Sequence, residues 1–136
     1  MMSEKALKAR GASALGQVVS YGMVAGPDSA SLLTQPSRAI LKALDKVGMK
    51  VADVNLFELN EAFAAVGIAS IADLGISDDI VNVNGGAIAL GHPIGMSGNR
   101  LALTILHELR RRGGGVGAVA LCGGGGQGDA LIVRTV

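Results

Sequence analysis

Two reactive side chains stand in glycine-rich segments of this chain. Cys122, the only cysteine, opens Cys122-Gly-Gly-Gly-Gly-Gln-Gly128, and His92 lies in Asn84-Gly-Gly-Ala-Ile-Ala-Leu-Gly-His-Pro-Ile-Gly-Met-Ser-Gly98. Glycine lets the backbone approach a ligand closely and turn its N–H groups inward. A free cysteine has a pKa of about 8.5 and needs only a modest shift to act as a base near neutrality. The sequence therefore predicts that the two segments form two parts of one reaction site.

Each of these residues also has a purely structural interpretation. Cys122 follows the apolar run 116–121 and could be an inert buried cysteine. However, four glycines exceed what the end of a strand needs, and a further strand follows too soon for a flexible linker. His92 could be an ordinary core histidine, but Gly91 and Pro93 restrict its loop and leave the ring little to pack against. On the residues alone, both interpretations of Cys122 remain open.

A helix expected to start near Ser97 would point its N-terminal amides towards the same region, which favours an anion or a thiolate there. Asn60-Glu-Ala-Phe63 begins another predicted helix. Local sequence favours Asn60 as the N-cap of that helix. A cap at a strand–helix junction also faces the edge of the sheet where ligands bind, so Asn60 could orient a water or a ligand oxygen.

Other classes of site fit the residues poorly. The glycines of 91–98 lack the Gly-Lys-Ser/Thr of a phosphate loop, and the Gly-x-Gly-x-x-Gly within 122–128 precedes a predicted strand rather than a helix. One cysteine and two histidines offer no ligand spacing for a metal. We therefore expect neither a metal site nor a nucleotide site.

Composition sets broad limits on the chain. Its 136 residues are enough for one domain, 1–136, and hydrophobic residues make up 49% of them with only 2% aromatic, so the core must be aliphatic. A net charge of +1 gives no electrostatic case for nucleic acid. No apolar run approaches the roughly 20 residues of a membrane span. A single cysteine makes a reducing, cytoplasmic location the default expectation.

The elements that must position these residues follow from periodicity and turn residues. Strands are expected over 15–24, 54–59, 80–83, 116–121 and 130–133, and helices over 4–10, 36–47, 60–74 and 97–112. This order predicts an α/β fold with a mixed, mainly parallel five-stranded sheet and helices on both faces. The helix over 60–74 carries only Glu61 and Asp73 as charges, which predicts burial on nearly every side.

Three motifs together resemble the thiolases. They are Asn60-Glu-Ala-Phe63, the segment from Asn82 to Gly98 with its Gly-His-Pro, and Cys122-Gly-Gly-Gly-Gly-Gln-Gly128. The order and spacing are similar to those of the C-terminal half of these enzymes, over essentially the whole chain. The related β-ketoacyl synthases are disfavoured, because they are not expected to carry a cysteine at the place of Cys122.

The resemblance implies a Claisen condensation of two acyl-CoA thioesters, or thiolysis of a 3-ketoacyl-CoA, with coenzyme A thioesters as substrates and no cofactor. By the resemblance, Cys122 is the acid/base cysteine that moves the α proton, and His92 activates the nucleophile and hydrogen-bonds the thioester oxygen. Asn60 would hold a water that stabilises the enolate, and the Gly124 N–H would serve a second oxyanion. Ala62 and Phe63 would contact the substrate.

The resemblance also implies that something is missing. The nucleophilic cysteine of the family belongs to its N-terminal half, and this chain has no second cysteine. We therefore expect an acid/base half of a short-chain enzyme, acetyl-CoA acetyltransferase, that is inactive alone. Such a half would associate with an N-terminal half or a partner subunit and form homo-oligomers. The alternative is a non-catalytic thiolase-like module that binds acyl-CoA or lipid or acts as a scaffold.

Overall fold

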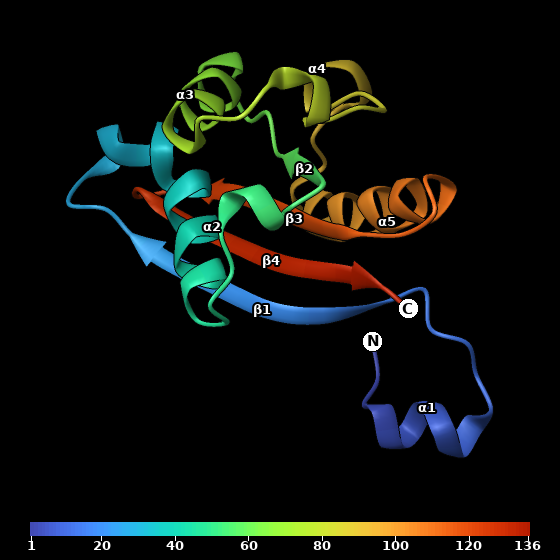
Figure 1. The fold of residues 1–136 in the computed structure, drawn as a ribbon. Helices are drawn as coiled ribbons and strands as arrows, with labels where there is room; N and C mark the ends of the chain where they lie inside the picture. The colour runs from blue at the N-terminus through green and yellow to red at the C-terminus, as the bar shows by residue number, and fades with distance from the viewer.

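The computed structural model covers residues 1–136 and has an α/β fold, which confirms the predicted class. A sheet lies between two helices that cover its opposite faces, α2 (Gln35–Asp45) and α5 (Ile94–Arg111) (Figure 1). The sheet has four strands: β1 (Gly16–Ala25), β2 (Leu56–Leu59), β3 (Val116–Gly123) and β4 (Gln127–Thr135). Helices on both faces were predicted and are present.

The sheet differs from the prediction in the number and pairing of its strands. Its order is β1-β4-β3-β2, with β4 antiparallel to both neighbours and β2 parallel to β3. Three strands run in one direction, but β4 lies between two of them, so only the β2–β3 pair is parallel and the sheet is mixed rather than mainly parallel. The predicted fifth strand over 80–83 is not formed.

The predicted strand over 80–83 does not form because of Asn82. Val81 makes a single parallel bridge with Phe57, and Asn82 then turns the chain away with a φ of 48°. The side chain of Asn82 bonds to Leu59 instead: its Oδ1 accepts from the Leu59 N–H at 2.9 Å, and its Nδ2 donates to the Leu59 carbonyl at 2.9 Å. A side-chain amide thus takes the place that a strand backbone would have occupied.

Alternation along the strands creates two apolar cores, one on each face of the sheet. Ala118 and Ala120 of β3 belong to the larger cluster, with Ile40 of α2, whereas Val119 belongs to the smaller one, with Leu101 and other residues of α5. Gly22 of β1 allows α2 to approach the sheet closely, because a Cβ there would lie 2.0 Å from the carbonyl oxygen of Ala39. Phe57 is the only aromatic residue in either core, so the core is aliphatic as predicted.

Two short helices lie across the end of the sheet where β2 and β3 finish (Figure 1). One is α3 (Ala64–Leu74), and the other is α4 (Ala87–Leu90), which was not predicted. Short 3-10 turns occupy Ser29–Thr34, Val51–Asp53 and Asp78–Ile80. The expected burial of α3 on nearly every side is wrong for this chain, because Ile68 is 70% exposed.

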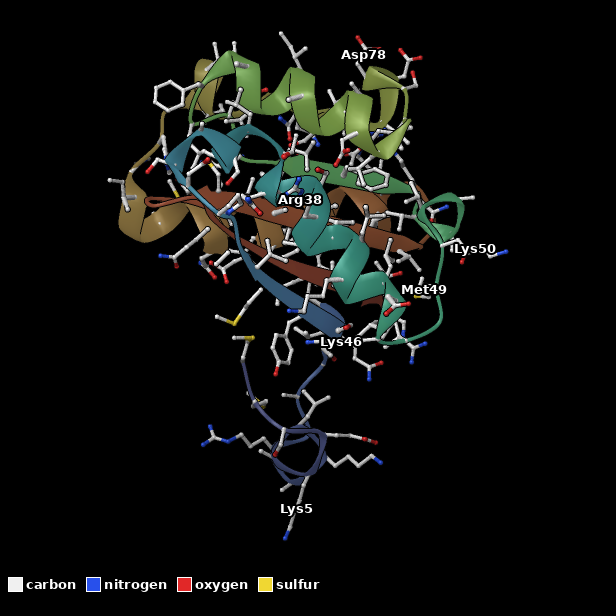
Figure 2. All side chains as sticks on the ribbon, turned by 90° about the vertical axis from the view of Figure 1, so that its left-hand side faces the viewer. Lys5, Arg38, Lys46, Met49, Lys50 and Asp78 are labelled. Carbon is white, nitrogen blue, oxygen red and sulfur yellow. The ribbon has the colours of Figure 1, made fainter.

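The first helix, α1 (Glu4–Arg10), has the predicted bounds and stands away from the sheet (Figure 1). Ser3 caps its start and Gly11 its end, yet none of its residues is buried. Figure 2 shows Lys5 on this helix pointing away from the rest of the chain. No helix combines the length and apolar character needed to cross a bilayer.

Candidate active site

The carboxyl ends of β2 and β3 bring two of the predicted residues to one edge of the sheet. Leu59 is the register partner of Ala120, and the N–H of Asn60 donates to the Ala120 carbonyl at 2.9 Å. Cys122 lies two residues beyond Ala120 on β3. Neighbouring strands lie about 4.8 Å apart. Asn60 and Cys122 therefore share this edge, where open α/β sheets place their ligands.

His92 reaches the same edge from the loop between α4 and α5. Its Nε2 lies 3.1 Å from Nδ2 of Asn60, so two motifs separated by 32 residues in sequence are in direct contact. Its Nδ1 lies 2.6 Å from Oγ of Ser97, in the first turns of α5. Asn60 and Ser97 are fully buried, whereas the ring of His92 remains exposed. The buried partners Asn60 and Ser97 hold the ring of His92 in place, while its exposed side remains open to a ligand.

The predicted capping role of Asn60 is wrong. Helix α3 starts only at Ala64, its N-cap is Phe63, and no side chain caps it. Two bends separate the end of β2 from this helix. The amide of Asn60 is therefore free for His92, and its Oδ1 is buried without a hydrogen-bond partner.

A carboxylate fastens the glycine segment 84–91 to the end of β2. Glu61 Oε1 accepts from Nδ2 of Asn82 at 2.9 Å, and its Oε2 accepts from the N–H of Ile88 at 2.9 Å. A Cβ on Gly86 would lie 2.3 Å from the same carboxylate, so this position requires glycine. Sequence reasoning assigned no role to Glu61 or Asn82. Their positions inside two of the three motifs were the available signal.

The glycines after Cys122 form the turn of the β3–β4 hairpin, and most have a structural reason. Gly125 and Gly126 have φ values of 79° and 76°, which favour glycine. A Cβ on Gly126 would also lie 2.1 Å from the Asp28 carbonyl, and one on Gly128 would lie 2.5 Å from the carbonyl of Gln35. Gly124 is exposed and has open space around it. The fold therefore leaves Gly124 accessible.

The Cys122 side chain is half-buried. Burial disfavours the thiolate and raises the pKa of Cys122 above its ordinary value, although a backbone hydrogen bond acts in the opposite direction. This direction is opposite to the shift that a base near neutrality would need. In this chain alone the thiol is therefore the favoured form at pH 7, and a base role for Cys122 needs a shift in the opposite direction from the rest of the site.

The two predicted substrate contacts lie just beyond Asn60. Phe63 is 62% exposed and Ala62 is half-buried. Among the surface hollows are one of about 430 Å³, lined by Glu61 and parts of α3 and α4, and one of about 330 Å³ over β1, β4 and β3. Neither includes His92, Cys122 or Phe63 in its lining. No cluster of three or more His, Cys, Asp or Glu residues is placed to hold a metal ion.

A buried ion pair lies behind the site. Glu58, two residues before Asn60, has a side chain that is 2% exposed, and Nη1 of Arg100 on α5 donates to its Oε2 at 3.4 Å. Burial raises the pKa of Glu58 from its ordinary value of 4.5 to about 7, although Arg100 acts to lower it. The pair connects β2, which carries Asn60, to the helix that carries Ser97.

This raised pKa predicts how stability depends on pH. Below pH 4.5 the Glu58 carboxyl is protonated in both states. Between pH 4.5 and 7 the unfolded chain ionises while the folded chain keeps its proton, so stability falls as pH rises, by about 3 kcal/mol at about 1.4 kcal/mol per pKa unit. Glu58→Gln should remove this loss in urea unfolding between pH 4.5 and 8. The exposed Glu4→Gln serves as the matched control, and an unchanged slope in Glu58→Gln would contradict the prediction.

Comparisons with known proteins give consistent results. The model of the thiolase C-terminal domain matches residues 12–135. A probable acetyl-CoA acetyltransferase of Mycobacterium tuberculosis (strain ATCC 25618 / H37Rv) is 54% identical over 134 residues, which are 98% of this chain and 34% of that protein. The crystal structure of the Bacillus anthracis acetyl-CoA acetyltransferase matches with a TM-score of 0.94 at 41% identity, over 99% of this chain and 34% of that one.

A third match carries a ligand in its own structure. Human mitochondrial 3-ketoacyl-CoA thiolase in complex with CoA matches with a TM-score of 0.93 at 43% identity, over 98% of this chain and 34% of that one. The chain thus spans about a third of the length of the relatives it matches. Helix α1 lies outside the residues that the family model matches.

Proposed function

This chain belongs to the thiolase family as its C-terminal domain, and from that premise we propose that it is the acid/base part of an acyl-CoA C-acyltransferase. The proposed reaction is the Claisen condensation of two acetyl-CoA molecules, or its reversal by thiolysis of a short 3-ketoacyl-CoA. Coenzyme A thioesters are the substrates, and no further cofactor takes part. The names of the relatives, two of them acetyl-CoA acetyltransferases, support this choice of substrate.

In this proposal each residue at the edge of the sheet has one task. Cys122 removes and returns the α proton of the second thioester. His92 activates the nucleophilic cysteine and hydrogen-bonds the thioester oxygen. Asn60 holds a water against the developing enolate, and the N–H of Gly124 donates to the oxyanion of the tetrahedral intermediate. Ala62 and Phe63 contact the substrate as it enters.

One observation carries the proposal: the contact between Asn60 and His92 at the sheet edge that Cys122 shares. Enolate formation from a thioester needs a proton acceptor and donors for the negative oxygen within one site. One such oxyanion donor is typically worth a factor of about 10² to 10³ in rate. The unpartnered buried Oδ1 of Asn60 is an acceptor able to hold a water. The open space at Gly124 supports the approach of a ligand to its N–H.

We further propose that the rest of the enzyme covers the exposed apolar side chains near the site. Five large apolar residues around α3, α4 and the start of α5 are at least 57% exposed, namely Phe63, Ile68, Ile88, Leu90 and Ile94. A patch of this kind marks an interaction surface. The nucleophilic cysteine would come from the part of the relatives that this chain does not span. Homo-oligomer formation and a cytoplasmic location stay predictions.

A chimera tests the proposed function directly. In the chimera, this chain replaces the C-terminal third of the Mycobacterium tuberculosis relative, which is 54% identical to it. We expect the chimera to cleave acetoacetyl-CoA in the presence of CoA, and the isolated chain to have no activity.

The controls separate catalysis from binding. Turnover by the isolated chain would contradict the proposed division of labour. A folded chimera that binds acyl-CoA without turnover would refute the catalytic proposal and favour the non-catalytic module. The unmodified relative, assayed in parallel, shows that the conditions support the reaction.

A further inference from the structure

A chain of hydrogen bonds runs through the candidate site and includes Ser97, a residue to which the sequence analysis gave no catalytic role. It passes from Nδ2 of Asn60 to Nε2 of His92 at 3.1 Å, and from Nδ1 of His92 to Oγ of Ser97 at 2.6 Å. From Ser97 it continues to the carbonyl of Pro93 at 3.1 Å. Asn60 and Ser97, on the two sides of the imidazole, are both fully buried.

The donors and acceptors along this chain determine where the imidazole carries its proton. A carbonyl only accepts, so the bond to Pro93 uses the single hydroxyl proton of Ser97. Oγ of Ser97 must then accept from Nδ1 of His92. At the other end, Nδ2 of Asn60 can only donate, so Nε2 of His92 must present its lone pair. Both ends require the same tautomer, with the proton on Nδ1.

The opposite tautomer satisfies fewer groups. With the proton on Nε2, the amide of Asn60 would have to rotate so that its Oδ1 accepts, and Ser97 would have to donate to Nδ1. The bond from Ser97 to Pro93 would then be lost, and two hydrogen bonds would replace three. The rotation of Asn60 would give Oδ1 a partner and leave the amide NH₂ without one, so the net cost is the lost bond from Ser97 to Pro93.

We propose that Ser97 is a positioning residue that holds His92 in the tautomer with the proton on Nδ1 and the lone pair on Nε2. The catalytic meaning of this tautomer rests on the proposed function; the tautomer itself does not. In the reaction, the hydrogen bond from Nδ2 of Asn60 to Nε2 of His92 breaks and frees the lone pair of Nε2. The nucleophilic S–H bond then breaks, its electron pair stays on sulfur, and the proton forms a bond to Nε2. The resulting imidazolium then donates from Nε2 to the thioester oxygen, while Nδ1 keeps its bond to Ser97.

The order of events follows from this arrangement. Nε2 of neutral His92 cannot donate a hydrogen bond, so it must act as a base before it can act as an oxyanion donor. A histidine held in the opposite tautomer would offer the donor first and could not take the thiol proton at Nε2. Ser97 therefore decides which of the two roles His92 performs first.

The test is the position of the ring proton, measured on the full 136-residue chain with ¹⁵N-labelled histidine. A long-range ¹H–¹⁵N spectrum, recorded at a pH where the imidazoles are neutral, distinguishes the two tautomers. His107 is exposed on α5 and serves as the internal reference. We expect His92 to be protonated at Nδ1 alone, whereas His107 should show the Nε2-protonated form that free imidazole side chains prefer.

Two variants identify Ser97 as the cause. Ser97→Ala should abolish the Nδ1-protonated signal pattern of His92 and leave His107 unchanged, and Ser97→Thr, which keeps the hydroxyl, should restore it. A wild-type His92 protonated at Nε2 would overturn the proposal even if neither variant folds. An unchanged His92 spectrum in a folded Ser97→Ala would overturn it as well. Neither measurement depends on turnover, so failure of this inference is distinct from failure of the proposed function.

Discussion

Cys122→Ala is expected to lower the kcat of the active chimera by about 10² to 10⁴, the range that a positioned acid/base group contributes. The α proton of a thioester is very weakly acidic, and alanine offers no group to move it. Cys122→Ser should lose nearly as much, because the hydroxyl has a far higher pKa than the thiol. Single-turnover assays of thiolysis and condensation measure the effect in both directions.

The design excludes a loss of folding as the cause. Removing one half-buried sulfur should leave the unfolding midpoint close to that of the parent. The exposed His107→Ala on α5 is the matched control and should keep full activity. Retention of more than a tenth of kcat in a folded Cys122→Ala would remove Cys122 from the proposed mechanism.

Gly126→Ala is expected to have the largest effect on stability, a loss of about 3 kcal/mol or more from two combined causes. With a φ of 76°, the backbone at this position is left-handed, which disfavours any residue with a Cβ. In addition, the new Cβ would lie 2.1 Å from the carbonyl of Asp28, a backbone atom that cannot move without its loop. The bond from the Gly26 N–H to the Gly126 carbonyl, at 2.7 Å, would be displaced with it.

Gly48→Ala separates the two causes. Gly48 has a similar φ of 66° but open space around it, so the same substitution there adds only the backbone strain, about 1 kcal/mol. Urea unfolding of both variants gives the difference, which is the cost of the clash. Equal losses in the two variants would show that the loop of Asp28 yields freely. Activity of Gly126→Ala in the chimera should fall too, because Gly124 and Cys122 belong to the same hairpin.

Most of the fold was predictable because its elements depend on local patterns. The bounds of α1 were predicted from its sequence, and the ends of β1, β3, β4, α2 and α5 differ from the expectation by at most three residues. The predicted strand over 80–83 failed because the side chain of Asn82 bonds to Leu59, 23 residues earlier. Hydrophobic periodicity contains no information on such a side-chain contact.

The candidate site was predictable to the extent that its residues carry chemistry of their own. The residue types of Cys122 and His92 and their glycine-rich surroundings were enough to predict them as candidate site residues. The structure brings His92 and Asn60 together. Ser97 and Glu61 were missed because their roles depend on partners rather than on residue type. Ser97 looks like any serine near a helix start until the ring of His92 lies against it.

The place of β4 in the middle of the sheet has a consequence during synthesis on the ribosome. The only strand partner of β1 is residues 127–135, more than a hundred positions later, so the hydrogen-bonding edge of β1 stays unpaired until those residues have been translated. Pairing between strands so far apart in sequence is slow, and the intermediate is prone to aggregation because its strand edges are unpaired. A nascent molecule that stalls before residue 127 would hold β1 as an unpaired strand beside the β2–β3 pair, and such a molecule is a natural client for a chaperone.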